Sequence, residues 1–202
     1  MEDNILEKNN KMVVEGYAIV FNQPTVLWEY EGKKIYEVID PRSLDNCDLS
    51  DVCFKYNHSD EVLIVASVKN GTLKLDVDKI GLKIRASLVN TTVGKDLYEM
   101  IKTKLLTKMS FAFAIEEDHY DKDTSTRVVR KIKRLFDVSA VTNPAYPQTN
   151  LYCVDNENLE SLRVSILNTY NSDREVERIK RNIKESSKLE LEKLKIKIKY
   201  KI

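Results

Sequence analysis

The sequence predicts an α+β protein: a mostly antiparallel β-barrel flanked by helices, followed by a helical, charged carboxyl-terminal extension. Three observations favour this fold class. Short apolar runs bounded by turn signals recur between residues 13 and 88. One segment with helical spacing follows them, and two strand-like segments come after it. Beyond Pro147 the sequence becomes polar, with scattered apolar residues at helical spacing.

The first half of the chain is typical of consecutive strands. The predicted strands cover residues 13–21, 28–39 (a hairpin folded around Glu31-Gly32-Lys33), 52–56, 62–68, 72–77 and 82–88. Asn70-Gly71 is a strong turn signal, and it predicts a hairpin between the segments 62–68 and 72–77. Pro41 ends the strand before it, and residues 42–44 are expected to open a short helix.

A single helix is predicted after these strands. Thr91 or Thr92 is the expected N-cap. The apolar residues that recur at helical spacing are Val93, Leu97, Met100, Ile101 and Leu105.

This helix leads into a strand that begins at Met109-Ser110. Alternation along a strand puts Phe111 and Phe113 on one face, and Ser110, Ala112 and Ala114 on the other. Ser110 is therefore expected on a face of small side chains, where a peptide could approach.

Residues 127–142 predict one long strand with a bulge. Its apolar residues do not keep the spacing of two that a regular strand requires; they are Val129, Ile132, Leu135 and Val138.

Three residues in separate strands suggest nucleophilic catalysis. A serine hydroxyl is a poor nucleophile until a base accepts its proton and an acid orients that base. Ser110 is the candidate nucleophile, and His58 follows the apolar run 52–54. The other histidine, His119, lies in a charged stretch that predicts a hairpin tip. Asp137 lies between Phe136 and Val138, where an unpaired carboxylate would be costly to bury, so a bond to His58 would satisfy it.

Each residue also has a plain structural interpretation. His58 could be a structural histidine, Ser110 a serine tolerated in a strand, and Asp137 a surface acid paired with Lys133 or Arg134. Two rival nucleophiles remain as well. Ser139 lies two residues from Asp137 on the same strand face, whereas Cys53 lies too close to His58 to meet it without a bend.

The order of several motifs is more specific than any one of them. They are residues 14–22, Glu37-Val38-Ile39-Asp40-Pro41, Asn57-His58, residues 70–75, Gly81-Leu82, Met109-Ser110-Phe111 and residues 137–147. Together they resemble the tailed-phage prohead proteases, a family that shares its fold with the herpesvirus assemblin protease. The resemblance covers about residues 12–150.

The chain departs from that family at a few positions. Ala112 stands where the family usually has a glycine, Val65-Ala66 where Leu-Gly is common, and Asp137 where glutamate is usual. The glycine that commonly precedes the nucleophile strand is also absent. These changes remove no catalytic side chain, but Ala112 requires an ordinary or a strained backbone beside Ser110.

The resemblance implies a serine endopeptidase of the phage prohead that cleaves scaffold or capsid precursor proteins and itself. Ser110 would be the nucleophile, His58 the general base and Asp137 the orienting acid, and helix-then-strand placement favours Ser110 over Ser139. Backbone amides around residues 143–145 are the candidate oxyanion-hole donors. The alternative is a non-catalytic capsid-assembly or scaffold protein that retains the protease fold.

The expected partners follow from the same resemblance. They are the precursor of the major capsid protein or a scaffold protein, and self-association is expected too. The expected location is the host bacterial cytoplasm, inside the assembling prohead. No cofactor or metal is expected. Nucleic acid is not expected as a partner, because the basic carboxyl end lacks interleaved aromatic residues.

Composition is compatible with one domain and an appendage. No stretch reaches the roughly 18 apolar residues of a membrane span, so no membrane association is expected. Cys47, Cys53 and Cys153 lack metal-ligand spacing and are expected to be reduced thiols. The predicted boundaries are a flexible amino terminus (1–11), a protease domain (12–153) and a basic carboxyl-terminal extension (154–202).

The net charge of +1 hides an asymmetry. Residues 178–202 contain ten Lys or Arg and three Glu, a net charge of +7, against 23 basic and 29 acidic residues before them, a net charge of −6. The last nine residues alternate strictly between apolar and mostly basic residues, which favours a strand over a helix. This extension is predicted to dock on a scaffold or capsid partner, or to be removed by autoprocessing; a solvated segment without a partner is the alternative.

Overall fold

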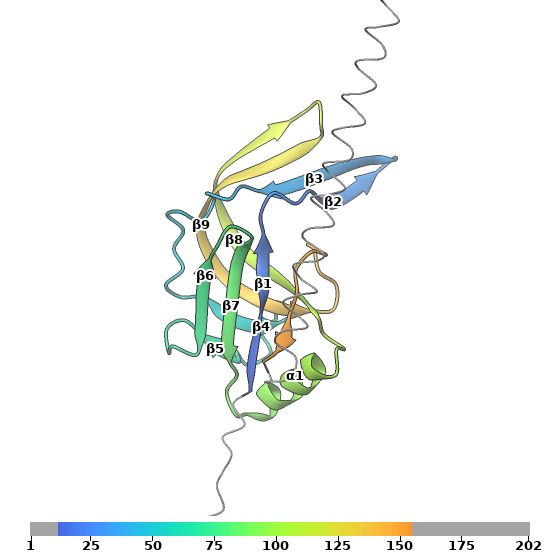
Figure 1. Cartoon of the computed structure of the whole chain (residues 1–202). Coiled ribbons are helices and arrows are strands. Elements are labelled where there is room, and N and C mark those ends of the chain that lie inside the picture. Colours follow the sequence, from blue (N-terminus) through green and yellow to red (C-terminus); the bar gives the residue numbers. More distant parts are fainter. Residues whose placement is uncertain (1–11, 155–202) are drawn as a thin grey trace, which may run out of the picture. The chain divides into compact units, whose positions relative to one another are not determined.

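The computed structural model describes residues 12–154, and Figure 1 shows how their strands are arranged. In chain order the elements are β1 (Val13–Val20), β2 (Thr25–Tyr30), β3 (Lys33–Ile39), β4 (Cys53–Tyr56), β5 (Ala66–Ser67), β6 (Leu73–Val77), β7 (Gly81–Ser87), α1 (Thr92–Lys102), β8 (Lys108–Asp121), β9 (Thr126–Val141) and β10 (Tyr152–Cys153). The described part of the chain is therefore mostly β with one helix, which agrees with the α+β class.

The strands form two sheets. One has the order β10-β1-β7-β6, and all its pairs are antiparallel. The other has the order β2-β3-β9-β4-β5, and β8 also pairs with β9. Most pairs are antiparallel, as predicted, but β9 runs parallel to both β3 and β4. These pairings do not by themselves close a barrel, so the barrel stays a prediction.

Strand β9 is the centre of the second sheet. Its first residues pair with β3 and its last residues, Asp137 to Ala140, pair with β4. The same last residues also pair with β8, so β4 and β8 must lie on opposite edges of β9. Figure 1 shows β8 and β9 as a long, curved hairpin.

The segment between β3 and β4 continues the ladder along β9. Ile132 N–H donates to the carbonyl of Ser43 at 2.9 Å, and Leu135 N–H donates to that of Asp48 at 3.1 Å. Residues 42–44 form turns, with Ser43 N–H donating to the carbonyl of Asp40 at 3.0 Å, so the short helix predicted there is wrong. Because the carbonyls of Ser43 and Asp48 both accept from β9, this segment runs along the edge of that strand and does not wind into a helix.

The bulge predicted in the long strand is confirmed. Ala112 pairs with Asp137 but Phe113 pairs with Leu135, so Phe136 is an extra residue in β9. Further register shifts follow along the hairpin. The four apolar residues of the predicted strand are all buried; they are Val129, Ile132, Leu135 and Val138. The shifts that add a residue to β9, at Arg130, Lys133 and Phe136, let the next apolar residue turn back to the core, which accounts for the irregular spacing.

The predicted helix is present as α1, with Thr91 as its N-cap. The Thr91 hydroxyl accepts a hydrogen bond from Gly94 N–H at 3.1 Å. Leu97 and Ile101 are buried, as expected for the apolar face. Leu105 lies beyond the end of the helix and is 76% exposed, so its assignment to that face is wrong.

Two other expectations fail after β4. Of the segment 62–68, only Ala66–Ser67 forms a strand, because the chain leaves the sheet at residues 57 and 58. Asn70-Gly71 does form a turn, with Gly71 at a φ of +75°. It joins β5 and β6, however, which belong to different sheets, so it closes no hairpin.

The predictions for residues 1–11 and 155–202 lie outside the described residues. These include the flexible amino terminus, the helical and basic extension, and its terminal strand. The boundary between the protease domain and the extension stays a prediction.

Candidate active site

Three neighbouring strands bring the candidate catalytic segments together. On the β9 edge that faces β8, Ser139 pairs with Ser110 and Asp137 pairs with Ala112. On the opposite edge, Asp137 pairs with Cys53 of β4. Directly paired residues in neighbouring strands point to the same side of a sheet. Ser110, Ser139 and Asp137 therefore share one face.

The other face of these strands belongs to the core. Phe54, Phe111 and Val138 are buried and form part of one apolar cluster. The alternation predicted for β8 is thus confirmed at Phe111, and it places the polar residues away from that cluster. Ala112 has no positive φ, so the alanine beside Ser110 has an ordinary backbone.

His58 lies in a tight turn directly after β4. Asn57 and His58 both have left-handed backbones, with φ values of 49° and 55°. Such conformations are uncommon outside glycine, and two in succession need external support. Asn57 N–H donates to the carbonyl of Ala140 at 2.9 Å, and the Asn57 side-chain oxygen accepts from Thr142 N–H at 3.1 Å. These bonds fasten the turn to the end of β9.

The turn directs the imidazole of His58 to Asp137. His58 Nδ1 lies 2.6 Å from Asp137 Oδ1. An ionised carboxylate only accepts hydrogen bonds, so Nδ1 is the donor, and in the neutral imidazole Nε2 then carries the lone pair. The His58 side chain is 34% exposed and that of Asp137 only 5%. The base is thus reachable from solvent while its partner is enclosed.

The carboxyl of Asp137 is held in its ionised form. Burial by itself would raise its pKa, but hydrogen bonds from His58 and Ser139 and the nearby charge of Lys55 outweigh that effect. The net result is a lowered pKa. The alternative that pairs Asp137 with Lys133 or Arg134 is not seen; Arg134 forms its ion pairs with Asp48 and Asp51.

Ser110 shares a sheet face with Asp137 and Ser139, but it is not bonded to the His58–Asp137 pair. The residue is 7% exposed, and no hydrogen bond joins it to His58 within residues 12–154. Hydrogen bonds between base and nucleophile are often long in a free enzyme and shorten when substrate binds. The arrangement provides a base with a free Nε2 and a serine on the same face of the sheet.

The two rival nucleophiles are placed differently. Ser139 is fully buried, and its hydroxyl donates to Asp137 Oδ1 at 2.8 Å, so its proton is already engaged. Cys53 pairs with Asp137 along the sheet, but no contact joins its thiol to His58 in the described chain. Neither residue offers a free nucleophile to the imidazole.

Sequence reasoning missed two residues beside the site. Lys55 pairs with Ser139 along the sheet and so shares its face. Its ammonium donates to Asp60 at 2.5 Å, and this bond is the main reason that its pKa is raised. Lys55 and Asp60 thus tie the two ends of the turn that carries His58. Alternation along β4 could have placed Lys55, but only the register of β4 on β9 places it near Asp137.

The segment that follows β9 returns to the start of β8. Met109 N–H donates to the hydroxyl of Thr149 at 3.0 Å, and that hydroxyl donates to the carbonyl of Met109 at 2.7 Å. Lys108 Nζ donates to the carbonyls of Pro147 and Thr149, at 2.5 Å and 2.9 Å. Burial lowers the pKa of Lys108. These bonds hold the segment 142–150 against the nucleophile strand; the assignment of the amides at 143–145 to an oxyanion hole stays a prediction.

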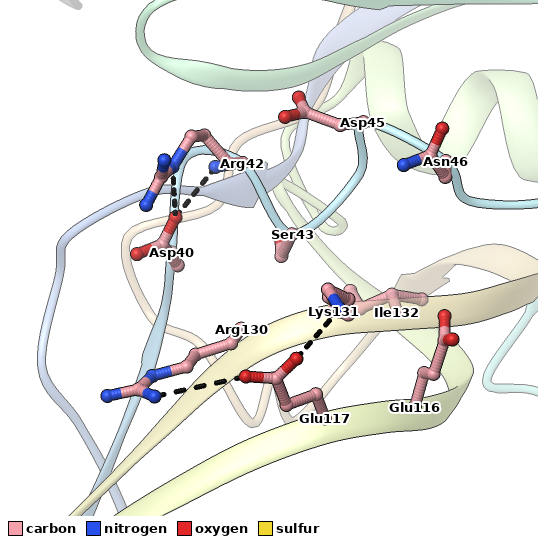
Figure 2. Close-up of a pocket in the computed structure, with 10 residues that line it drawn as sticks. All are labelled: Asp40, Arg42, Ser43, Asp45, Asn46, Glu116, Glu117, Arg130, Lys131 and Ile132. Carbon is pink, nitrogen blue, oxygen red and sulfur yellow. Dashed lines mark hydrogen bonds and ion pairs between the residues drawn. The ribbon is translucent and has the colours of Figure 1, made fainter.

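A polar cavity of about 580 Å³ lies elsewhere in the fold (Figure 2). It is lined by Asp40, Arg42, Ser43, Asp45, Asn46, Glu116, Glu117, Arg130, Lys131 and Ile132. Several of its charges are already paired, since Glu117 contacts both Lys131 and Arg130. Ser110, His58 and Asp137 do not line it, so this cavity is separate from the candidate active site.

Residues 12–154 contain neither a cluster of metal ligands nor a membrane-spanning helix. No three His, Cys, Asp or Glu side chains gather as metal ligands would in this part of the protein. Among the same residues, no helix is sufficiently long and apolar to cross a membrane.

Comparison with known proteins defines the class of the molecule as a serine peptidase. The sequence matches the model of the caudovirus prohead serine protease family over residues 1–163, which is most of the chain. The chain therefore belongs to the caudovirus prohead serine proteases, and the family predicted from its motifs is confirmed.

A solved structure was found to be similar to this chain. The crystal structure of the herpesvirus KSHV protease in complex with a hexapeptide phosphonate inhibitor is 14% identical in sequence, with a TM-score of 0.44. The match covers 79% of this chain and 76% of the KSHV chain. None of the curated proteins matches the sequence.

Proposed function

We propose that the protein is the endopeptidase of a phage prohead, with Ser110 as nucleophile, His58 as general base and Asp137 as orienting acid. The observation that carries the proposal is the 2.6 Å contact between His58 Nδ1 and Asp137 Oδ1, on the sheet face that also carries Ser110. Membership of the prohead protease family supports the same reaction class.

The mechanism is acyl transfer through a covalent intermediate. His58 Nε2 accepts the proton of Ser110 as the serine oxygen attacks the peptide carbonyl, and it then gives that proton to the leaving amine. Asp137 keeps Nδ1 protonated and stabilises the imidazolium that forms. Water then attacks the acyl-enzyme with His58 again acting as the base, which releases the second product and restores Ser110.

The proposed substrates are the scaffold protein or the scaffold-like part of the capsid precursor, and the protease itself. The family is named for the prohead, and this supports capsid or scaffold proteins as partners. The proposed place of action is the interior of the assembling prohead in the host bacterial cytoplasm.

The direct test compares Ser110→Ala with wild type during co-expression with the capsid precursor. We expect new protein termini in the wild-type sample, found by mass spectrometry, and none with Ser110→Ala. A fluorophosphonate probe should label wild type at Ser110. If processing continues in Ser110→Ala, the assignment of Ser110 as the nucleophile is wrong. Wild type that neither labels nor processes would favour the non-catalytic assembly protein instead.

A further inference from the structure

The hydroxyl of Ser139 connects both partners of the His58–Asp137 pair. It donates to Asp137 Oδ1 at 2.8 Å and accepts from the backbone N–H of His58 at 3.2 Å. Ser139 is fully buried on β9, between Lys55 of β4 and Ser110 of β8. A hydroxyl has one proton, and Ser139 uses it for the hydrogen bond to the carboxylate.

The first of these bonds fixes the orientation of the acid. Oδ1 of Asp137 accepts from both Ser139 Oγ and His58 Nδ1. Two donors that meet at one oxygen define the rotation of the carboxylate plane more closely than one donor could. The lowered pKa of Asp137, in which the Ser139 hydrogen bond opposes the effect of burial, agrees with this arrangement.

The second bond supports the backbone of the base. His58 follows Asn57 in a turn where both residues have positive φ, a conformation that the surroundings must hold. Without Ser139 the N–H of His58 would lose its acceptor in a partly buried position, and an unpaired N–H is costly. The turn would then be free to relax and to carry the imidazole away from Ser110.

We propose that Ser139 is a positioning residue of the peptidase, whose hydroxyl holds the carboxylate of Asp137 and the left-handed turn of His58 in the one arrangement that aims Nε2 at Ser110. This inference rests on the proposed roles of Ser110, His58 and Asp137.

The test uses Ser139→Ala and Ser139→Cys in the full chain. Cysteine has the shape of serine with a somewhat larger atom at the γ position and is only a weak donor, so it fills the site while weakening the hydrogen bonds. Ser67→Ala is the matched control, because Ser67 is also a buried serine of this sheet and lies outside the site. The readouts are the rate of fluorophosphonate labelling as a function of pH, and Tm.

We expect both Ser139 variants to label more slowly by on the order of ten- to a hundredfold, the effect of a small displacement of a catalytic group. The acidic limb of their pH–rate profile, where the labelling rate falls with falling pH, should also move to higher pH. A carboxylate with one donor fewer is more basic, so it stabilises the protonated imidazole and delays formation of the neutral base. Ser67→Ala should keep both the wild-type rate and the wild-type limb.

Two outcomes would overturn the inference. One is a Ser139→Cys variant with the rate and pH limb of wild type, whatever Ser139→Ala does, because the volume of the side chain would then be what matters. The other is a slower rate with an unmoved limb in both variants, which a structural role alone would produce. If Ser110→Ala and His58→Ala also keep the wild-type rate, it is the proposed function that fails.

Discussion

At the residue scale, the structure adds most to what the sequence indicated about Asp137. It is 4% exposed and makes its hydrogen bonds with His58 and Ser139. The sequence predicted that a carboxylate between Phe136 and Val138 needs a partner and named His58, but it did not indicate the bond from Ser139. The bulge at Phe136 explains how it obtains one, since the extra residue restores the apolar alternation and leaves Asp137 on the polar face.

A pH-dependent contribution of Asp137 to stability follows. Its pKa is lowered in the folded protein, whereas in the unfolded chain it returns to about 3.9. The stabilisation is therefore complete above the unfolded value and is lost as the pH falls through the lowered folded value. Asp137→Asn should reduce the free energy of unfolding at pH 7, and its difference from wild type should shrink as the pH falls below the unfolded pKa and through the lowered folded pKa.

Urea denaturation at several pH values would measure this difference. Asp123→Asn, in the exposed turn between β8 and β9, is the matched control and should leave the pH dependence of wild type unchanged. A difference between wild type and Asp137→Asn that stays constant with pH would contradict the assignment.

At the scale of elements, β8, which carries Ser110, depends on the segment that follows β9. Thr149 is fully buried; its hydroxyl accepts from Met109 N–H, and its single proton lies within hydrogen-bonding distance of the carbonyls of Met109 and Tyr146. The local sequence around Thr149 does not predict that its side chain bonds to β8, because its partner Met109 is 40 residues away. A polar residue among Pro147, Gln148 and Asn150 is typical of an ordinary surface loop.

Thr149→Val should therefore destabilise the protein more than its small change in shape suggests. Valine leaves the N–H and the carbonyl of Met109 without their side-chain partner, so we expect a loss of about 1–3 kcal/mol in the free energy of unfolding. The labelling rate of Ser110 should fall as well, since Ser110 is the next residue along β8. Chemical denaturation and probe labelling measure the two effects.

Thr107→Val is the control for this substitution. Thr107 is exposed and lies just before β8, so the same change there should alter stability by less than about 0.5 kcal/mol. Equal effects at both positions would show that the hydroxyl of Thr149 is not the anchor.

At the scale of the whole molecule, the basic extension is the least explained part of the chain. Residues 178–202 carry a net charge of +7, from ten basic and three acidic residues. A solvated appendage, a docking segment and a sequence removed by autoprocessing are the three interpretations that the composition allows.

Autoprocessing predicts a specific product. Intact-mass spectrometry of purified wild type should show a species that has lost part of the chain after residue 154, and Ser110→Ala purified in the same way should keep its full mass. A protein truncated after residue 154 that still enters proheads would exclude docking through the extension. Loss of the same fragment from Ser110→Ala would exclude self-cleavage.

Much of the site could be predicted because its signals are local. Strand alternation predicted that Ser110 and Phe111 lie on opposite faces of β8. The irregular spacing of the apolar residues in β9 indicated the bulge; these residues are Val129, Ile132, Leu135 and Val138. Residue type identified His58 and Asp137 as candidates, and the order of the motifs predicted the family that the comparison confirmed.

What only the tertiary structure decided is how distant segments meet. His58 and Asp137 are 79 residues apart, and Ser139 reaches His58 across 81 residues. Their contacts require β4 to run parallel to β9 in one register, and a shift of one residue would turn every side chain of β4 to the other face. Local sequence determines which face a residue takes within its strand, but the packing of the whole sheet selects its neighbours. Only the tertiary structure therefore shows that the hydroxyl of Ser139 bonds to Asp137 and to the backbone of His58.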